Sequence, residues 1–349
     1  MPMKNEQVDS ELVVSRREFG GVVGGFAGKL AMGSAGLGAW LGAAGLTSAK
    51  DEAQAKALMS KQMHSVPRGL FSVKFGEYTI YSIIDGMVPM KRGLFSGNEA
   101  DISKVLESTG QTGEVIPSPI SAFLLKSEKK NILIDAGLGS LGMMGPGFGN
   151  LIPGLAATNT RPEDIDTLII THAHPDHIGG MLDEKGSLIF PNAEVIISET
   201  EVKFWMDDAI KAKVPEGARG AFDLAQKTFK ACGDQLTQVA SGKEVATGVV
   251  MKQAAGHTPG HSIIHIDGGG SDELLMIADT LHNTELHTAL PDIQFAFDVD
   301  SAQAAKTRRK IFDQLATDKA LALCSHGHFP GLGRILKSGN AYRYSASSL

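Results

Sequence analysis

The stretch Thr171-His172-Ala173-His174-Pro175-Asp176-His177 places three imidazoles and a carboxylate within six residues. It follows the apolar run Leu168-Ile169-Ile170 and precedes the pair Gly179-Gly180. Neutral imidazole nitrogens and carboxylate oxygens are the usual ligands of zinc and similar divalent cations. Because an apolar strand that ends in such a cluster delivers it to the edge of a sheet, the motif predicts a metal site at a strand end.

Three further predicted strands also end in side chains that can bind a metal. His257 and His261 lie in the run 256–261, directly after an apolar strand pattern. Asp279 closes a second such pattern, and His326 follows a third. Strand ends of one sheet share an edge, and this is where open sheets place their ligands. We therefore expect these side chains to converge with the first motif.

The bulk composition is that of a globular protein. The chain has 349 residues, 42% of them hydrophobic and 21% charged, which permits one large domain or two small ones. The net charge of −6 gives no basic footprint, so we expect no nucleic-acid partner. The two cysteines, Cys232 and Cys324, do not make a disulfide scaffold, and Cys324 lies in an apolar run that predicts burial.

The first 49 residues resemble a twin-arginine signal peptide. Ser15-Arg16-Arg17-Glu18-Phe19 precedes a Gly/Ala-rich segment, and Thr47-Ser48-Ala49 offers a cleavage site. The charge-free run 30–46 is 17 residues long, just short of a membrane span. We expect export to the periplasm, a polar linker over 50–67 and no stable membrane insertion after processing. A retained membrane anchor or a cytoplasmic location is the alternative.

The remaining residues, 68–349, show strand patterns first and then strands mixed with helices. Strands are predicted at 71–75, 78–83, 122–125, 131–134, 168–171, 194–197, 249–254, 262–266, 274–278 and 321–325. Helices are predicted at 199–209, where Ser198 and Glu201 resemble a capping box, and at 301–317. This order is typical of a sheet sandwich flanked by helices.

These segments together resemble the metallo-β-lactamase superfamily, over residues 70–349. Within it the chain is most similar to the methyl parathion hydrolases and related lactonases. The matching stretches are 171–180, 190–193, 204–205, 257–261 and 326–331, and the last two carry the closer likeness. The resemblance implies an α+β fold, an αβ/βα sandwich with its metal site at one edge of the two sheets.

The resemblance also implies two divalent ions per chain. The first ion would be held by His172, His174 and His257, the second by Asp176, His177 and His326, with Asp279 between them. Zinc is the expected metal, although manganese, cobalt and iron accept the same donors. Asp135 and His261 are expected to orient the ligands without binding metal themselves. A homodimer is compatible with the resemblance.

The implied activity is hydrolysis of ester-type bonds in aryl organophosphate triesters, lactones or carboxylic esters. A hydroxide held between two metal ions is the expected nucleophile. The catalytic roles would fall to Asp176, which relays a proton, and Asp279, which sets the metal separation. Substrate contacts are expected from Phe148, Trp205, Phe222 and His282. For the aromatic residues core packing is the alternative, and for His282 a surface role.

Other function classes fit the residues less well. An iron-dependent redox enzyme of the same fold usually has a glutamate at the position of His174. A glyoxalase II-like thioesterase would need a basic cluster for the carboxylates of glutathione, and none is evident. A binding protein with a vestigial site is disfavoured because all seven ligand positions hold the expected residue type. A nuclease is disfavoured by the negative net charge.

Overall fold

The computed structural model describes residues 69–139, 147–270 and 272–347. The predicted signal peptide 1–49 and the predicted linker 50–67 lie outside the described residues. The export that the N-terminal sequence predicts therefore stays a prediction. None of the helices in the described ranges combines the length and apolar character needed to cross a membrane.

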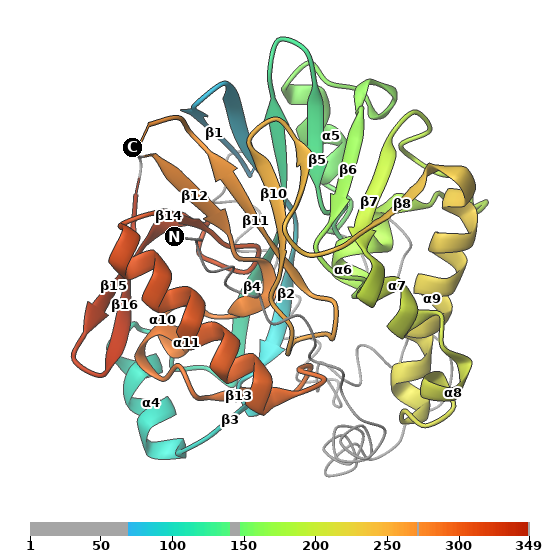
Figure 1. Cartoon of the computed structure of the whole chain (residues 1–349). Helices are drawn as coiled ribbons and strands as arrows, with labels where there is room; N and C mark the ends of the chain where they lie inside the picture. The colour runs from blue at the N-terminus through green and yellow to red at the C-terminus, as the bar shows by residue number, and fades with distance from the viewer. Residues whose placement is uncertain (1–68, 140–146, 271, 348–349) are drawn as a thin grey trace, which may run out of the picture.

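Two large sheets lie face to face within the described residues (Figure 1). The first sheet has the strand order β1 (Leu70–Phe75), β2 (Tyr78–Lys91), β4 (Val115–Lys126), β5 (Asn131–Ile134), β6 (Thr167–Ile170), β7 (Glu194–Ser198) and β8 (Leu236–Val239). The second has the order β16 (Ala341–Ala346), β15 (Leu332–Ser338), β14 (Leu321–Leu323), β12 (Glu273–Met276), β11 (Ser262–Asp267), β10 (Val249–Gln253) and β9 (Lys243–Ala246). The short strands β3 (Phe95–Ser96) and β13 (Gln294–Phe295) pair separately.

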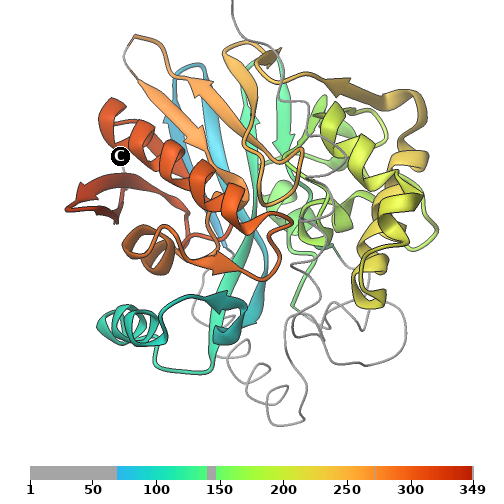
Figure 2. The same cartoon turned by 60° about the horizontal axis from the view of Figure 1, so that its bottom comes forward.

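Helices cover the outer faces of both sheets (Figures 1 and 2). The first sheet is covered by α5 (Leu151–Ala157), α6 (Pro175–Ile178), α7 (Glu199–Trp205) and α9 (Glu216–Cys232), with α8 (Asp208–Lys211) beside them. The second is covered by α11 (Ser301–Asp318), while α10 (Thr284–Ala289) and α4 (Glu99–Ser108) lie at the lower end of the molecule in Figure 1. The predicted helix–sheet–sheet–helix sandwich is thereby confirmed.

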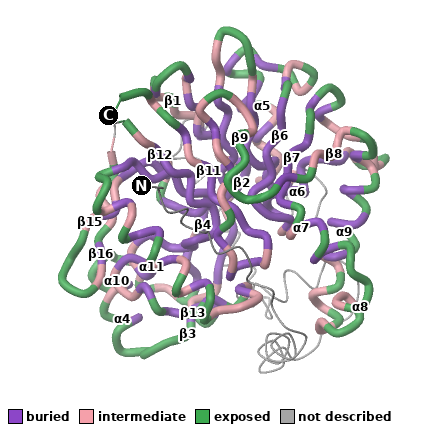
Figure 3. Tube along the Cα trace, viewed as in Figure 1, coloured by how far each residue is buried: buried purple, intermediate pink, exposed green. Residues whose placement is uncertain are grey.

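The pattern of burial explains the layers. All four residues of β6 are buried, and they alternate between two cores. Ile169 points into the core between the sheets, whereas Leu168 and Ile170 point to the core beneath the helices. A strand buried on both faces requires a continuous apolar run, which is what the sequence before His172 provides. Figure 3 shows the buried trace concentrated in these central strands.

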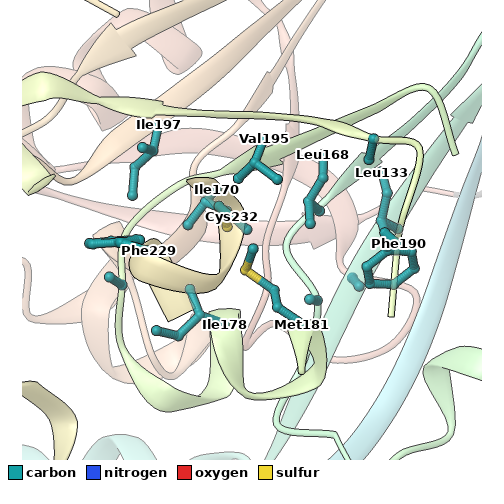
Figure 4. Packing of buried hydrophobic residues seen from close by; sticks show 14 of the residues in the cluster. Leu133, Leu168, Ile170, Ile178, Met181, Phe190, Val195, Ile197, Phe229 and Cys232 are labelled. Carbon is teal, nitrogen blue, oxygen red and sulfur yellow. The ribbon is translucent and has the colours of Figure 1, made fainter. Parts of the chain in front are cut away.

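The core under the helices of the first sheet is closely packed (Figure 4). Its labelled members are Leu133, Leu168, Ile170, Ile178, Met181, Phe190, Val195, Ile197, Phe229 and Cys232. Two of them, Ile178 and Met181, directly follow the histidine-rich motif, so this core anchors the chain on its exit from that motif. Cys232 is a free, buried thiol, and so is Cys324, as predicted.

All ten predicted strands are present, but β2 and β4 run beyond their predicted bounds. Gly86, Pro117 and Pro119 read as breakers in the sequence, yet the two strands stay paired from Thr79 to Lys91. A register shift at Gly86 absorbs the irregularity, as a β-bulge does. Strands β8, β9, β15 and β16 were not predicted, because polar or charged residues interrupt their apolar patterns.

The predicted capping box is wrong. The Ser198 side chain makes no capping hydrogen bond at the start of α7, and the Glu201 carboxylate turns inward to other donors. The helix predicted over 199–209 also ends earlier, at Trp205. Asp207 then begins α8 by accepting hydrogen bonds from the backbone of Ala209 and Ile210.

The core between the sheets carries a prediction about stability. Phe123 of β4 is completely buried in it, so Phe123→Ala should lower the free energy of unfolding by about 3–5 kcal/mol through lost burial and a cavity. Chemical denaturation of the metal-loaded protein measures this change. The control is Met206→Ala, because Met206 is 37% exposed and should change stability little. Equal losses for the two variants would contradict the packing described.

Candidate metal centre

The histidine-rich motif is held at the end of β6 by Asp135. This buried carboxylate follows β5 and accepts hydrogen bonds from the backbone N–H of Thr171, at 2.9 Å, and from its hydroxyl. Its Oδ2 lies 2.7 Å from Nδ1 of His177. A histidine that donates one ring N–H to a carboxylate keeps the other nitrogen free as a ligand. Asp135 therefore turns Nε2 of His177 toward the site, the orienting role expected from the resemblance.

The seven residues expected to bind metal converge in two groups that share Asp279. The groups are His172, His174, His257 and Asp279, and Asp176, His177, His326 and Asp279. Within each group the ligand atoms lie within 4.8 Å of one another, and all of these residues are buried except His174, which is half-buried. The structure thus brings together residues from four strand ends.

The buried lone pairs fit a pair of cations. Nε2 of His177 and Oδ1 of Asp279 lie 3.2 Å apart, and both are buried without a hydrogen-bond partner. In the other group Nδ1 of His174 lies 2.8 Å from Nε2 of His257 and 3.1 Å from Nε2 of His172. Unpaired buried polar atoms are expensive, and this set of nitrogen and carboxylate donors is satisfied by divalent metal ions.

His261 positions Asp279 and lies outside both ligand groups. Its Nδ1 donates to the carbonyl of Ala254 at 2.9 Å, and its Nε2 accepts from the backbone N–H of Asp279 at 3.1 Å. Burial lowers the pKa of His261 to about 3, so the ring is neutral and can accept that bond. The sequence placed this residue in a supporting role, and the geometry describes how it acts.

Sequence reasoning missed Asp298. Its Oδ1 lies 2.9 Å from Nδ1 of His257, and its Oδ2 lies 3.8 Å from Nη2 of the buried Arg308. Arg308 also donates to the carbonyl of Thr280, beside Asp279. Burial lowers the pKa of Arg308 to about 10, so it stays charged at neutral pH. The one signal in the sequence is Arg308 itself, a charge among the buried apolar positions of α11.

A small cavity opens onto the two ligand groups. Its volume is about 20 Å³, enough for water or small ions. The lining residues are Val88, Met90, His174, Asp176, His257, Asp279, His282, Phe295, Phe297 and His326. The lining thus combines aromatic and aliphatic side chains, called here the apolar wall, with the potential metal ligands. This composition is typical of a site for a small, partly apolar substrate.

Of the predicted substrate-binding residues, His282 lines this cavity. Its ring stacks on the Phe295 ring, with centroids 3.8 Å apart, and its Nε2 lies 3.0 Å from Oδ2 of Asp279. The rings of Trp205 and Phe222 pack on each other in the core under the helices, with centroids 4.6 Å apart. Their contacts are therefore those of core residues. Phe148 packs against the hydrophobic cluster that contains Val88 and Phe295, but it does not line the cavity. The aromatic wall comes instead from Phe295 and Phe297.

The carboxylates dominate the electrostatics of the site. Burial acts to lower the pKa of His257 and of His326, but the nearby carboxylates outweigh it and raise these values to about 9 and about 10. Burial acts to raise the pKa of Asp176, yet His177 and His326 hold it at about 2. The pocket therefore attracts positive charge, either protons or metal ions.

Metal binding should accordingly release protons. His257 and His326 carry raised pKa values, so they hold protons at pH 7 that a metal must displace. We expect more than one proton per chain to be released when two zinc ions bind to the metal-free protein. Calorimetry in buffers of different ionisation enthalpy measures this number. A binding heat that is the same in all buffers would contradict the prediction, and metal affinity should fall as the pH is lowered.

Two sheets whose strand ends bring together seven potential metal ligands place the chain among the metal-binding αβ/βα sandwiches. The family model described as the metallo-beta-lactamase superfamily matches residues 115–328, and the chain belongs to that superfamily.

Solved structures support this assignment. The structure of AidC, a dizinc quorum-quenching lactonase in complex with a product, N-hexanoyl-L-homoserine, is 30% identical. It has a TM-score of 0.75 and covers 80% of this chain and 98% of its own. The hydrolase AbOPH of the beta-lactamase superfamily is 27% identical, with a TM-score of 0.75 over 81% of this chain and 99% of its own. An N-acyl homoserine lactonase of Bacillus sp. is 23% identical over 63% of this chain and 86% of its own length.

Proposed function

We propose that this protein is a dinuclear metal-dependent lactonase that opens lactone rings bearing an apolar chain. The observation that carries the proposal is the pair of ligand groups sharing Asp279 beneath a cavity with an apolar wall. The likeness to AidC and to the Bacillus lactonase supports the lactone as substrate class. Organophosphate triesters and simple esters are the competing substrates, and the geometry favours neither of them specifically.

The residues divide the chemical work between them. Two bound divalent ions would supply a water-derived nucleophile at neutral pH and positive charge for the oxyanion that develops. His172, His174 and His257 would hold one ion, and Asp176, His177 and His326 the other, with Asp279 shared.

The cavity walls provide proton transfer and substrate binding. The carboxylate of Asp176 faces the cavity and can accept the proton of the attacking water and return it to the ring oxygen that leaves. The apolar side chains of Val88, Met90, Phe295 and Phe297 line the same cavity as the ligands, so they would contact the apolar chain of a substrate bound there.

The substrate class can be tested directly. We expect the protein loaded with zinc to hydrolyse N-hexanoyl homoserine lactone with a higher kcat/KM than an aryl phosphotriester or an aryl acetate. A pH-stat follows the acid released from the lactone, and absorbance follows the aryl leaving groups. A higher kcat/KM for either aryl substrate would reassign the substrate class. A protein that retains two ions yet hydrolyses none of the three would refute the proposal.

The shared carboxylate can be tested by substitution. Asp279→Ala removes the one ligand common to both groups, so we expect loss of both ions and of nearly all activity. Elemental analysis and the lactone assay measure the two losses. The matched control is His265→Gln on β11, since His265 faces Glu273 at 3.7 Å and belongs to neither ligand group. Retention of both ions and full activity by Asp279→Ala would overturn the ligand assignment.

A further inference from the structure

We propose that Glu201 is a positioning residue that holds the two loops of the three-histidine group, His172, His174 and His257, at the separation a metal ion needs. The inference rests on the proposed dinuclear centre but concerns a residue outside it. Glu201 lies on α7 and belongs to neither ligand group. Its role follows from which backbone and side-chain groups its carboxylate binds.

Each oxygen of Glu201 binds two donors. Oε1 accepts from the backbone N–H of Ala173 at 3.0 Å and from the indole N–H of Trp205 at 2.6 Å. Oε2 accepts from the hydroxyl of Thr258 at 2.7 Å and from the backbone N–H of Gly260 at 2.9 Å. Ala173 stands between His172 and His174, and Thr258 follows His257 directly. One carboxylate therefore ties together both loops that carry the three histidines.

The two loops belong to different sheets. The loop at Ala173 follows β6 of the first sheet, whereas the loop at Thr258 connects β10 and β11 of the second. A backbone hydrogen bond from Ser262 to the carbonyl of Thr171, at 3.0 Å, joins the adjacent strand ends. Glu201 adds the connection beyond those ends, at the level of the ligands themselves.

Burial of the Glu201 carboxylate carries a large desolvation cost. The residue has 0% exposure, and in the described part of the chain no lysine or arginine nitrogen lies within 4.0 Å of its carboxylate. A buried carboxylate without a cation is tolerated only when hydrogen bonds replace its hydration. All four donors come from the segments that surround the metal centre. The cost of burial is thus offset by bonds that also define the geometry of the loops.

Close packing fixes the carboxylate in place. A Cβ on Gly260 would lie 2.2 Å from the backbone nitrogen of Glu201, so the start of α7 rests directly on this loop. One turn further along α7, the Trp205 ring meets the His174 ring edge-on, with centroids 5.5 Å apart. The helix therefore supports His174 through Trp205 and the His257 loop through Glu201.

The other ligand group has its own support. Asp135 binds His177 and Thr171, as described above, and the hydrogen bonds found for Glu201 involve none of Asp176, His177 and His326. The Glu201 carboxylate thus contacts only the loops of the three-histidine group, whereas Asp135 binds a ligand of the other group, His177, directly. Loss of the Glu201 carboxylate should weaken one ion site and spare the other, an outcome that a merely structural role would not produce.

The test is Glu201→Gln. The amide keeps the shape but replaces one oxygen by an NH₂ group, which cannot accept the two bonds that this oxygen received. Stepwise Co²⁺ binding is followed by calorimetry, and the imidazole N–H resonances shifted by the ion are followed by NMR. An ion in the three-histidine site shifts the resonances of three ligand imidazoles, whereas an ion in the other site shifts those of two, so the two sites can be told apart. We expect the affinity of the three-histidine site to fall about 10–100-fold, the usual effect of removing an orienting partner, with the other site unchanged.

Two control variants complete the design. Glu199→Gln makes the same chemical change two residues earlier on α7, at an exposed position, and should leave both affinities unchanged. Asp135→Asn, unlike Glu201→Gln, should weaken the site of Asp176, His177 and His326, because Asp135 binds the His177 ring directly. If Glu201→Gln does not fold, Thr258→Val removes a single bond to Oε2 and should weaken the three-histidine site about threefold to tenfold, the worth of one hydrogen bond.

The outcomes separate this inference from the proposed function. Unchanged affinities in Glu201→Gln, or an equal fall at both sites, would overturn the positioning role. A selective fall at the three-histidine site would support it, whether or not the protein hydrolyses a lactone, because Co²⁺ binding is measured without substrate. Failure of the lactone assay alone would overturn only the substrate assignment.

Discussion

One buried carboxylate, Asp279, faces five imidazoles, and the arrangement of the rest of the molecule follows from this constraint. Their Nε2 atoms lie between 3.0 and 3.6 Å from its oxygens and belong to His172, His177, His257, His282 and His326. These groups follow strands of both sheets, so the two face-to-face sheets must hold their strand ends aligned at one edge of the sandwich. The apolar runs that bury strands on both faces provide the rigidity this requires.

A second layer of buried carboxylates maintains that alignment. Asp135 orients His177, Asp298 orients His257, and Glu201 joins the two loops of the three-histidine group. Asp85 of β2 is a further buried carboxylate, which accepts backbone hydrogen bonds from Leu138, Gly139 and Leu151. Asp135, Glu201 and Asp85 accept hydrogen bonds on both carboxylate oxygens, whereas Oδ2 of Asp298 has only Arg308 nearby, at 3.8 Å. The centre is therefore preorganised by negative charge before any substrate arrives.

The sequence predicted the features that depend on local pattern. Apolar runs predicted the positions of the central strands. The spacing of His172, His174, Asp176 and His177 predicted a metal centre because these four ligands lie close together in the sequence. The sequence did not predict features that depend on contacts distant along the chain. Asp298 and the aromatic wall of Phe295 and Phe297 have no motif of their own, and Glu201 resembled a helix cap until its partners 28 to 59 residues away were known. The length of β2 could not be predicted, because a glycine such as Gly86 can mark either a β-bulge within a strand or the end of a strand.

The positions of the ligands along the chain impose an order of assembly during synthesis. The three-histidine group has all its members once residue 279 has emerged from the ribosome, whereas the other group waits for residue 326 and the strand β14 that presents it. Between these two moments a nascent chain would offer one complete ligand set and one that lacks His326. Synthesis from the N-terminus to the C-terminus therefore completes the two sites at different times, although they share Asp279 in the finished protein. The second ligand group becomes complete only when most of the second sheet has been synthesised.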